Sequence, residues 1–126
     1  MKEIEESLIH VRNIFVDCPK RYGLTNDYLT KINNEIQDIM HVIELGTLDA
    51  VARVKMVNEL KILRKKRREL KNELEILEIV KEFINQPKPN EKTISKILGS
   101  VRSRIELQGK RTYRMRERPD LQHYIK

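Results

Sequence analysis

The sequence predicts an all-α protein whose centre is one long antiparallel helical hairpin, packed like a coiled coil. Glycine and proline number only four each in 126 residues, too few for the many tight turns of an all-β protein. Charged residues make up 36% of the chain and hydrophobic residues 39%, a balance typical of long helices with one polar and one apolar face. The third observation is that apolar residues recur at alternating spacings of three and four, the spacing of coiled-coil helices.

The first helix of the hairpin is expected over residues 26–45. Thr25 is a suitable N-cap, because its hydroxyl can accept from the free amides of the first turn, and Asp27 lies near the positive end of the helix dipole. Gly46 is expected to close the helix as a C-terminal glycine. The apolar stripe of this helix consists of Leu29, Ile32, Ile36, Ile39 and Ile43.

The second helix of the hairpin is expected over residues 48–85, opened by Thr47 and Asp49. Two prolines, Pro87 and Pro89, cannot continue it. A connection of only two or three residues between two such helices makes them antiparallel neighbours. The apolar stripe consists of Met56, Leu60, Leu63, Leu70, Leu74, Leu77 and Ile84.

Two basic residues, Arg67 and Lys81, occupy positions in this apolar stripe. A buried charge without a partner is costly. Arg67 is therefore expected either to reach past the edge of the stripe or to pair with Glu35 or Asp38 across the hairpin. Such a polar position fixes the register of the two helices.

An N-terminal helix is expected over residues 2–16, because Ile4, Leu8, Val11 and Phe15 share one face. The segment from Cys18 to Gly23 is expected to break the chain before the hairpin, since Pro19 lacks an amide donor and Gly23 permits a turn. Cys18 is read as a small residue at the edge of this loop. As the only cysteine, it excludes a disulfide within the chain and a multi-cysteine zinc site.

A C-terminal helix is expected after Asn90 or Thr93, either of which can cap it. Its apolar face contains Ile94, Ile97, Leu98, Val101 and Ile105, and Gly109 is expected to end it. The sequence thus divides into a helical domain at 1–108 and a basic tail at 109–126. Within the tail, Pro119 and Asp120 can open a last short turn.

The long helix outreaches its predicted hairpin partner by about 17 residues, or roughly 25 Å at the rise of an α-helix. Leu70, Leu74 and Leu77 lie in the part that extends beyond the partner. They must be covered by the N-terminal helix or by a second copy of the chain, and we expect a homodimer.

The sequence argues against an enzyme and predicts neither a cofactor nor a metal ion. His10, His41 and His123 lie on different predicted elements, and none has a convincing ligand or catalytic partner at a suitable spacing. No phosphate-cradling glycine loop or nucleophile motif is present in the sequence. No apolar run approaches the ~20 residues of a membrane span, and the N-terminus lacks the order of a signal peptide. A cytoplasmic location without a membrane partner is therefore expected.

Charge is distributed unevenly along the chain. The net charge is +7, but residues 1–50 hold 5 basic and 9 acidic side chains, whereas residues 51–126 hold 21 and 10. Such asymmetry points to an anionic partner, a nucleic acid or a nucleoprotein. Four basic residues share an arc of about 100° on the polar side of the predicted long helix. We call them the basic ridge: Lys61, Arg64, Lys65 and Arg68. The alternative is an ordinary solvated outer face of a coiled coil.

Arginines are also concentrated at the C-terminal end of the chain. The planar guanidinium group suits phosphates and stacked bases, and a nearby tyrosine offers a stacking face. The alternative is an arm that wraps back onto the acidic N-terminal half of its own or a neighbouring chain. The candidate binding residues here are Arg102, Arg104, Lys110, Arg111, Tyr113, Arg114, Arg116 and Arg118.

Several short motifs resemble small uncharacterised helical, coiled-coil proteins of Gram-positive phages and prophages. The resemblance covers residues 30–118 and implies a phage or prophage setting inside a bacterial host, without an activity to transfer. The motifs are His41-Val-Ile-Glu44-Leu, Asp49-Ala50, Glu59-Leu60, Arg67-Arg68, Lys71, Glu73-Leu-Glu75 and Arg111-Thr-Tyr113-Arg-Met-Arg116.

Three functional hypotheses follow from these patterns. The first is a non-enzymatic protein that contacts nucleic acid or a nucleoprotein through the basic ridge and the arginine-rich tail. The second is a protein that binds a host protein and inhibits a host defence system, as an anti-CRISPR protein does. The third is a structural homo-oligomer. Steep salt dependence of binding would distinguish the first from the other two.

Overall fold

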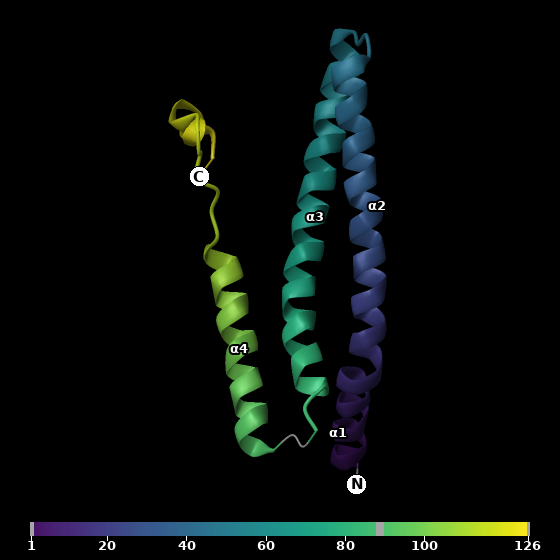
Figure 1. Cartoon of the computed structure of the whole chain (residues 1–126), viewed down its shortest axis with the longest axis vertical. Coiled ribbons are helices and arrows are strands. Elements are labelled where there is room, and N and C mark those ends of the chain that lie inside the picture. Colours follow the sequence, from purple (N-terminus) through teal and green to yellow (C-terminus); the bar gives the residue numbers. More distant parts are fainter. Residues whose placement is uncertain (1, 88–89, 126) are drawn as a thin grey trace.

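The computed structural model describes residues 2–87 and 90–125. Over these residues it is 86% helical and contains no strand, which confirms the predicted all-α class. None of the helices in the described ranges combines the length and the apolar character that crossing a membrane demands. In chain order, the elements are α1 (Lys2–Arg12), the π-helix η1 (Asn13–Asp17), α2 (Cys18–Leu45), α3 (Ala50–Ile84), α4 (Glu91–Lys110) and the 3₁₀-helix η2 (Pro119–Tyr124) (Figure 1).

The predicted hairpin is present as the antiparallel pair α2 and α3 (Figure 1). Asp49 caps α3, since its Oδ1 accepts from the Ala52 N–H at 2.8 Å. Gly46 closes α2 as expected, but for a different reason. Its φ of −86° and ψ of 158° are extended rather than left-handed. A side chain there would lie 2.5 Å from the Val42 carbonyl oxygen, so the close approach of this carbonyl requires glycine.

Only a small apolar core forms between the helices. Among the described residues, the buried apolar side chains are Leu70, Leu77 and Val80, all on α3. Leu74 is half-buried. The part of α3 that was expected to be covered by the N-terminal helix or by a second copy is therefore packed within the chain. The cover comes from α2, which begins earlier than predicted, and from α4.

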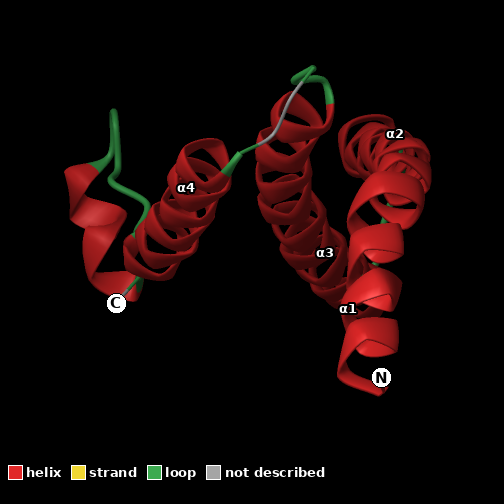
Figure 2. Ribbon diagram, turned by 90° about the horizontal axis from the view of Figure 1, so that it is seen from below, coloured by secondary structure: helices red, strands yellow, loops and turns green. Residues whose placement is uncertain are grey.

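The predicted break between Cys18 and Gly23 is wrong. The chain stays helical through this segment, and Gly23 lies inside α2. The π-helix η1 precedes Pro19, and the Cys18 N–H donates to the Asn13 carbonyl, five residues back. A π turn widens the helix, so the missing N–H and the ring of Pro19 are accommodated without a loop. The axis nevertheless bends at η1, and α1 leaves the line of α2 (Figure 2).

Two predicted roles at the hairpin change as a consequence. Thr25 does not cap a helix; it lies within α2, is 4% exposed, and its Oγ1 is 3.4 Å from Glu73 Oε1. Arg67 donates from Nε to Asn33 Oδ1 at 2.8 Å rather than to a carboxylate. Glu35 and Asp38, the predicted partners, lie beside residues 59, 62 and 63 of α3 instead. They therefore lie nearer the hairpin loop than Arg67 does. The apolar stripe predicts which face of each helix is paired, but it does not fix how far one helix is shifted along the other.

Helix α4 packs along α3 on the side away from α1 and α2 (Figure 2). Its start is capped as predicted: Asn90 Oδ1 accepts from the Thr93 N–H at 3.0 Å, while Thr93 Oγ1 accepts from the Asn90 N–H at 2.8 Å. This reciprocal pair satisfies two otherwise free amides. Gly109 lies within α4 instead of ending it, since the helix continues to Lys110. Of the two prolines expected before α4, Pro89 lies outside the described residues.

Candidate functional site

The end of α4 is fixed against the middle of α3 by polar contacts. Gln108 Nε2 donates to the Asn72 carbonyl oxygen at 3.0 Å and to Glu75 Oε2 at 3.1 Å. Gln108 lies on the same face of α4 as Val101 and Arg104, all half-buried and spaced three and four residues apart. This face is therefore the one that α4 turns toward α3.

The first residue of the tail after α4 is also bound to Glu75 of α3. Arg111 Nη1 donates to Glu75 Oε1 at 2.8 Å. This hydrogen bond and that from Gln108 hold the pKa of Glu75 below its ordinary value, with Arg111 as the larger cause. The first residue after α4 is thereby anchored to α3, and the rest of the tail starts from a fixed position.

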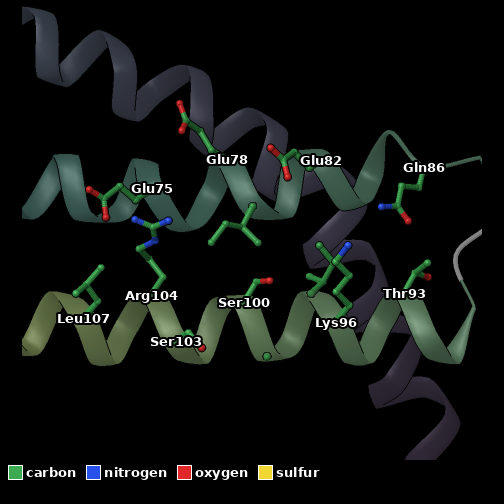
Figure 3. Close-up of a pocket in the computed structure, with 13 residues that line it drawn as sticks. Glu75, Glu78, Glu82, Gln86, Thr93, Lys96, Ser100, Ser103, Arg104 and Leu107 are labelled. Atoms are coloured by element: carbon green, nitrogen blue, oxygen red, sulfur yellow. The ribbon is translucent and has the colours of Figure 1, made fainter.

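A polar cleft of about 790 Å³ lies between α3 and α4 (Figure 3). Glu75, Glu78 and Glu82 enter its lining from α3, and Lys96 and Arg104 from α4. Figure 3 shows Arg104 directed toward Glu75, across the gap between the helices. The cleft thus joins an acidic stretch of α3 to a basic face of α4. Of the three glutamates, Glu75 is engaged, since Gln108 and Arg111 both donate to it.

The described residues contain no group of three or more histidines, cysteines and carboxylates arranged to hold a metal ion. The single thiol, Cys18, is half-buried at the start of α2, not at a loop edge. Burial is the main cause that raises the pKa of Cys18 above its ordinary value, so its nucleophilic thiolate form is disfavoured at neutral pH.

The basic ridge lies on exposed surface of α3, just beyond the point where α4 ends. All four of its side chains are exposed. At 100° per residue, Lys61, Lys65 and Arg68 continue the same stripe of α3 as Asn72 and Glu75, at steps of four, three, four and three. Since Asn72 and Glu75 meet the end of α4, the ridge is the uncovered continuation of the face that α4 covers.

Beyond Arg111 the tail folds back on itself over residues 113–124, and we call this segment the hook. The side chain of Gln122 closes the hook: its Oε1 accepts from the Met115 N–H at 2.8 Å, and its Nε2 donates to the Tyr113 carbonyl at 3.0 Å. Arg118 donates two hydrogen bonds to Asp120, at 2.9 and 2.7 Å, and this lowers the pKa of the Asp120 carboxyl. Among the described residues, η2 comes close to none of the helices. It lies on the α4 side of the molecule in both views (Figures 1 and 2).

The predicted binding residues therefore fall into two groups. One group is exposed and makes no ion pair within the described part of the chain: Lys61, Arg64, Lys65, Arg68, Arg102, Arg114 and Arg116. Of these, Arg102 lies nearly opposite Arg104 around α4, so it faces away from α3. The other group is engaged within the chain: Arg104 faces Glu75, Lys110 pairs with Glu106 at 2.9 Å, Arg111 pairs with Glu75, and Arg118 pairs with Asp120. Tyr113 is 55% exposed.

Sequence reasoning did not identify the residues that position this surface. Gln108 could have been found, because it extends the three-four spacing of Val101 and Arg104 along α4. Gln122 could not have been found in this way, because the residues of the hook show neither the spacing of a helix nor that of a strand. Glu75 was noted in the sequence, but nothing local showed that Arg111, 36 residues away, would bind it.

Comparisons with models of protein families, with curated proteins and with solved structures give no match to this chain.

Proposed function

We propose that the protein is a non-enzymatic binding protein that contacts the phosphate backbone of a nucleic acid, or of a nucleoprotein, through the basic ridge and the hook of the tail. The observation that carries the proposal is that the ridge continues the α4-facing stripe of α3 at the place where the tail begins. The ridge and Arg114 with Arg116 are exposed and make no ion pair among the described residues, and the end of the tail lies on the α4 side of the molecule (Figure 1). Such a concentration of charge attracts phosphates and releases their counterions.

The aromatic side chains of the hook favour a strand with unpaired bases. Tyr113 is 55% exposed and Tyr124 is 77% exposed. The centroids of the Tyr124 and His123 rings lie 4.1 Å apart. Exposed aromatic rings beside arginines stack on unpaired bases, whereas a duplex keeps its bases stacked inside. We therefore favour single-stranded RNA or DNA over a duplex. The setting in the cytoplasm of a bacterial host stays a prediction from the resemblance to phage proteins.

Fluorescence anisotropy with a labelled single-stranded oligonucleotide tests the proposal. The four residues of the ridge together with Arg114 and Arg116 can make six phosphate contacts. Six such contacts predict that affinity for a single strand falls by about two to three orders of magnitude between 50 and 200 mM salt. Replacing Lys61, Arg64, Lys65 and Arg68 with glutamate is expected to abolish this binding while the helix content, measured by circular dichroism, stays unchanged.

A matched control reverses four basic residues elsewhere on the helices. Arg12, Lys20, Lys31 and Lys55 are exposed and lie outside the ridge and the tail. Their reversal changes the net charge by the same amount, so it separates a local surface from a general effect of charge. If both variants lose affinity equally, or if the unmodified protein binds neither RNA nor DNA at low salt, the proposal is wrong. Co-purification with a host protein that survives nuclease treatment would then favour the inhibitor hypothesis.

A further inference from the structure

An open apolar groove runs along the side of α3 that faces η1 and the start of α2. Its volume is about 520 Å³. The floor is α3, and one wall is α4, whose Ile94 and Leu98 are 50% and 46% exposed. Its apolar lining includes Ile76, Val80, Phe83, Ile94, Leu98 and Val101. Helix α3, helix α4 and the segment formed by η1 and the start of α2 thus make three sides of a helical bundle, and the fourth side is open.

Helix α1 carries an apolar stripe that nothing in the described part of its own chain covers. Ile4, Leu8 and Val11 are 57%, 63% and 50% exposed. Among the described elements, α1 lies close only to η1, into which it runs, and it extends past the end of α3 (Figure 1). Covering this stripe would remove apolar surface from water and add stability that α1 does not gain within the described part of its own chain.

The exposed surface of the whole chain is large enough to supply such an interface. It measures 10742 Å², whereas a compact monomer of 15.1 kDa exposes about 7,100 Å². The excess of about 3,600 Å² is more than one protomer contributes to an obligate homodimer, which buries roughly 2,000–5,000 Å² in total. Large apolar side chains of α1 and α4 form part of that excess.

We propose that a second copy of this chain completes the bundle, with α1 of each protomer seated in the apolar groove of the other. Helix α1 has 11 residues, or a length of about 16 Å, and the α4 wall from Ile94 to Ile105 spans about 17 Å, so the two lengths match. Charge fits as well, because α1 has three glutamates against one lysine and one arginine, while α4 has five basic and two acidic residues. Reciprocal exchange gives a closed, two-fold symmetric dimer.

The chain's own α1 cannot occupy its own groove in this structure. Helix η1 joins α1 to α2 without a loop, as the hydrogen bond from Cys18 to Asn13 shows. To fold back, the chain would have to break η1 and lose these backbone hydrogen bonds. An α1 that arrives from a second copy requires no such break.

Sedimentation equilibrium of the full chain tests this interface. We expect a dimer of twice 15.1 kDa whose dissociation constant rises by at least about tenfold in Leu8→Glu and in Leu98→Glu, because each places a charge in the apolar contact. Val51→Glu is the control, since Val51 is 80% exposed at the far end of the hairpin. A monomer at all concentrations, or a dimer that tolerates both α1 and α4 substitutions, would overturn the proposal. Circular dichroism of each variant shows whether it is folded.

Disulfide trapping distinguishes exchange from folding back. In a Cys18→Ser background, a chain with Leu8→Cys is mixed with a chain with Leu98→Cys and oxidised. A disulfide between the two different chains is expected, and Leu8→Cys mixed with Val51→Cys should give none. If a single chain that carries both cysteines closes its disulfide only at monomer mass, α1 folds back on itself and the proposal fails. Both measurements are independent of nucleic acid, so their failure leaves the proposed binding function standing or falling on its own test.

Discussion

The α2–α3 hairpin and the outer helices α1 and α4 use the same three-four spacing of apolar residues, yet only the hairpin buries them. Leu70, Leu77 and Val80 of α3 are buried, whereas neither α1 nor α4 contains a buried residue. The difference lies in the number of neighbours. Among the described elements, helix α3 has α2 and η1 on one side and α4 on another, while α4 has only α3 and α1 has only η1. An apolar stripe therefore predicts a helix, but its contribution to stability depends on what covers it.

The largest expected effect is the difference between one leucine in the hairpin and one on α4. Leu77 is 7% exposed and Leu107 is 49% exposed. Leu77→Ala removes buried side chain and leaves a cavity, so it should lower the free energy of unfolding by about 2–5 kcal/mol. The same change at Leu107 should cost less than about 1 kcal/mol, because half of that side chain already contacts water. Urea denaturation followed by circular dichroism measures both, and equal costs would contradict the contrast.

The tail allows a second contrast, between arginines that face solvent and one that is anchored. Arg114→Glu with Arg116→Glu should weaken binding to a single-stranded oligonucleotide by about tenfold or more at low salt, without changing the melting temperature, because these exposed side chains support no packing. Arg111→Ala should instead lower the melting temperature slightly, since it removes the bond to Glu75. A clear drop in melting temperature for the double variant with binding retained would favour an arm that stabilises its own chain.

The two capped helix starts should respond differently to the loss of their caps. Asp49→Ala and Asn90→Ala each remove a side chain that accepts from a first-turn amide, a change worth about 1 kcal/mol. At Asp49 the loss should appear in global unfolding, because α3 contributes the buried core. At Asn90 it should appear as faster hydrogen exchange in α4, which can open while the hairpin stays folded. An equal increase of exchange in α4 and in the buried part of the hairpin would argue that the two unfold as one unit, and unchanged exchange in α4 would argue that the cap contributes nothing.

The smallest expected effect is the pH dependence of stability that comes from the Glu75–Arg111 pair. The pKa of Glu75 is lowered in the folded chain relative to its ordinary value of 4.5, mainly by Arg111. The ionised carboxylate is thus favoured by folding, so its contribution is fully present above the unfolded pKa and is lost as pH falls through the lower folded pKa. Because both side chains are about one-third exposed, it should be less than about 1 kcal/mol. Melting curves between pH 7 and pH 3 should show this loss, and Glu75→Gln should remove it.

The sequence by itself determined the antiparallel hairpin, the caps of α3 and α4 and the exposed position of the basic ridge. These features depend on local spacing: Asp49 and Asn90 lie directly before their helices, and Lys61 to Arg68 share an arc whatever the partner of that helix is. The extent of the first helix was not predictable in this way. Pro19 and Gly23 favour a break locally, but the widened turn of η1 and the packing of α2 on α3 keep the chain helical.

Only the tertiary structure decided which charges are available to a partner. Arg111 and Arg114 look alike in the sequence, yet Arg111 is bound to Glu75, whereas Arg114 makes no ion pair among the described residues. Likewise, Arg67 meets Asn33 rather than Glu35 or Asp38. The physical reason is the same in both cases. A three-four spacing fixes the face of a helix, whereas the partner of a given side chain depends on how far one helix is shifted along the other, and that shift is set by packing over the whole length of the pair.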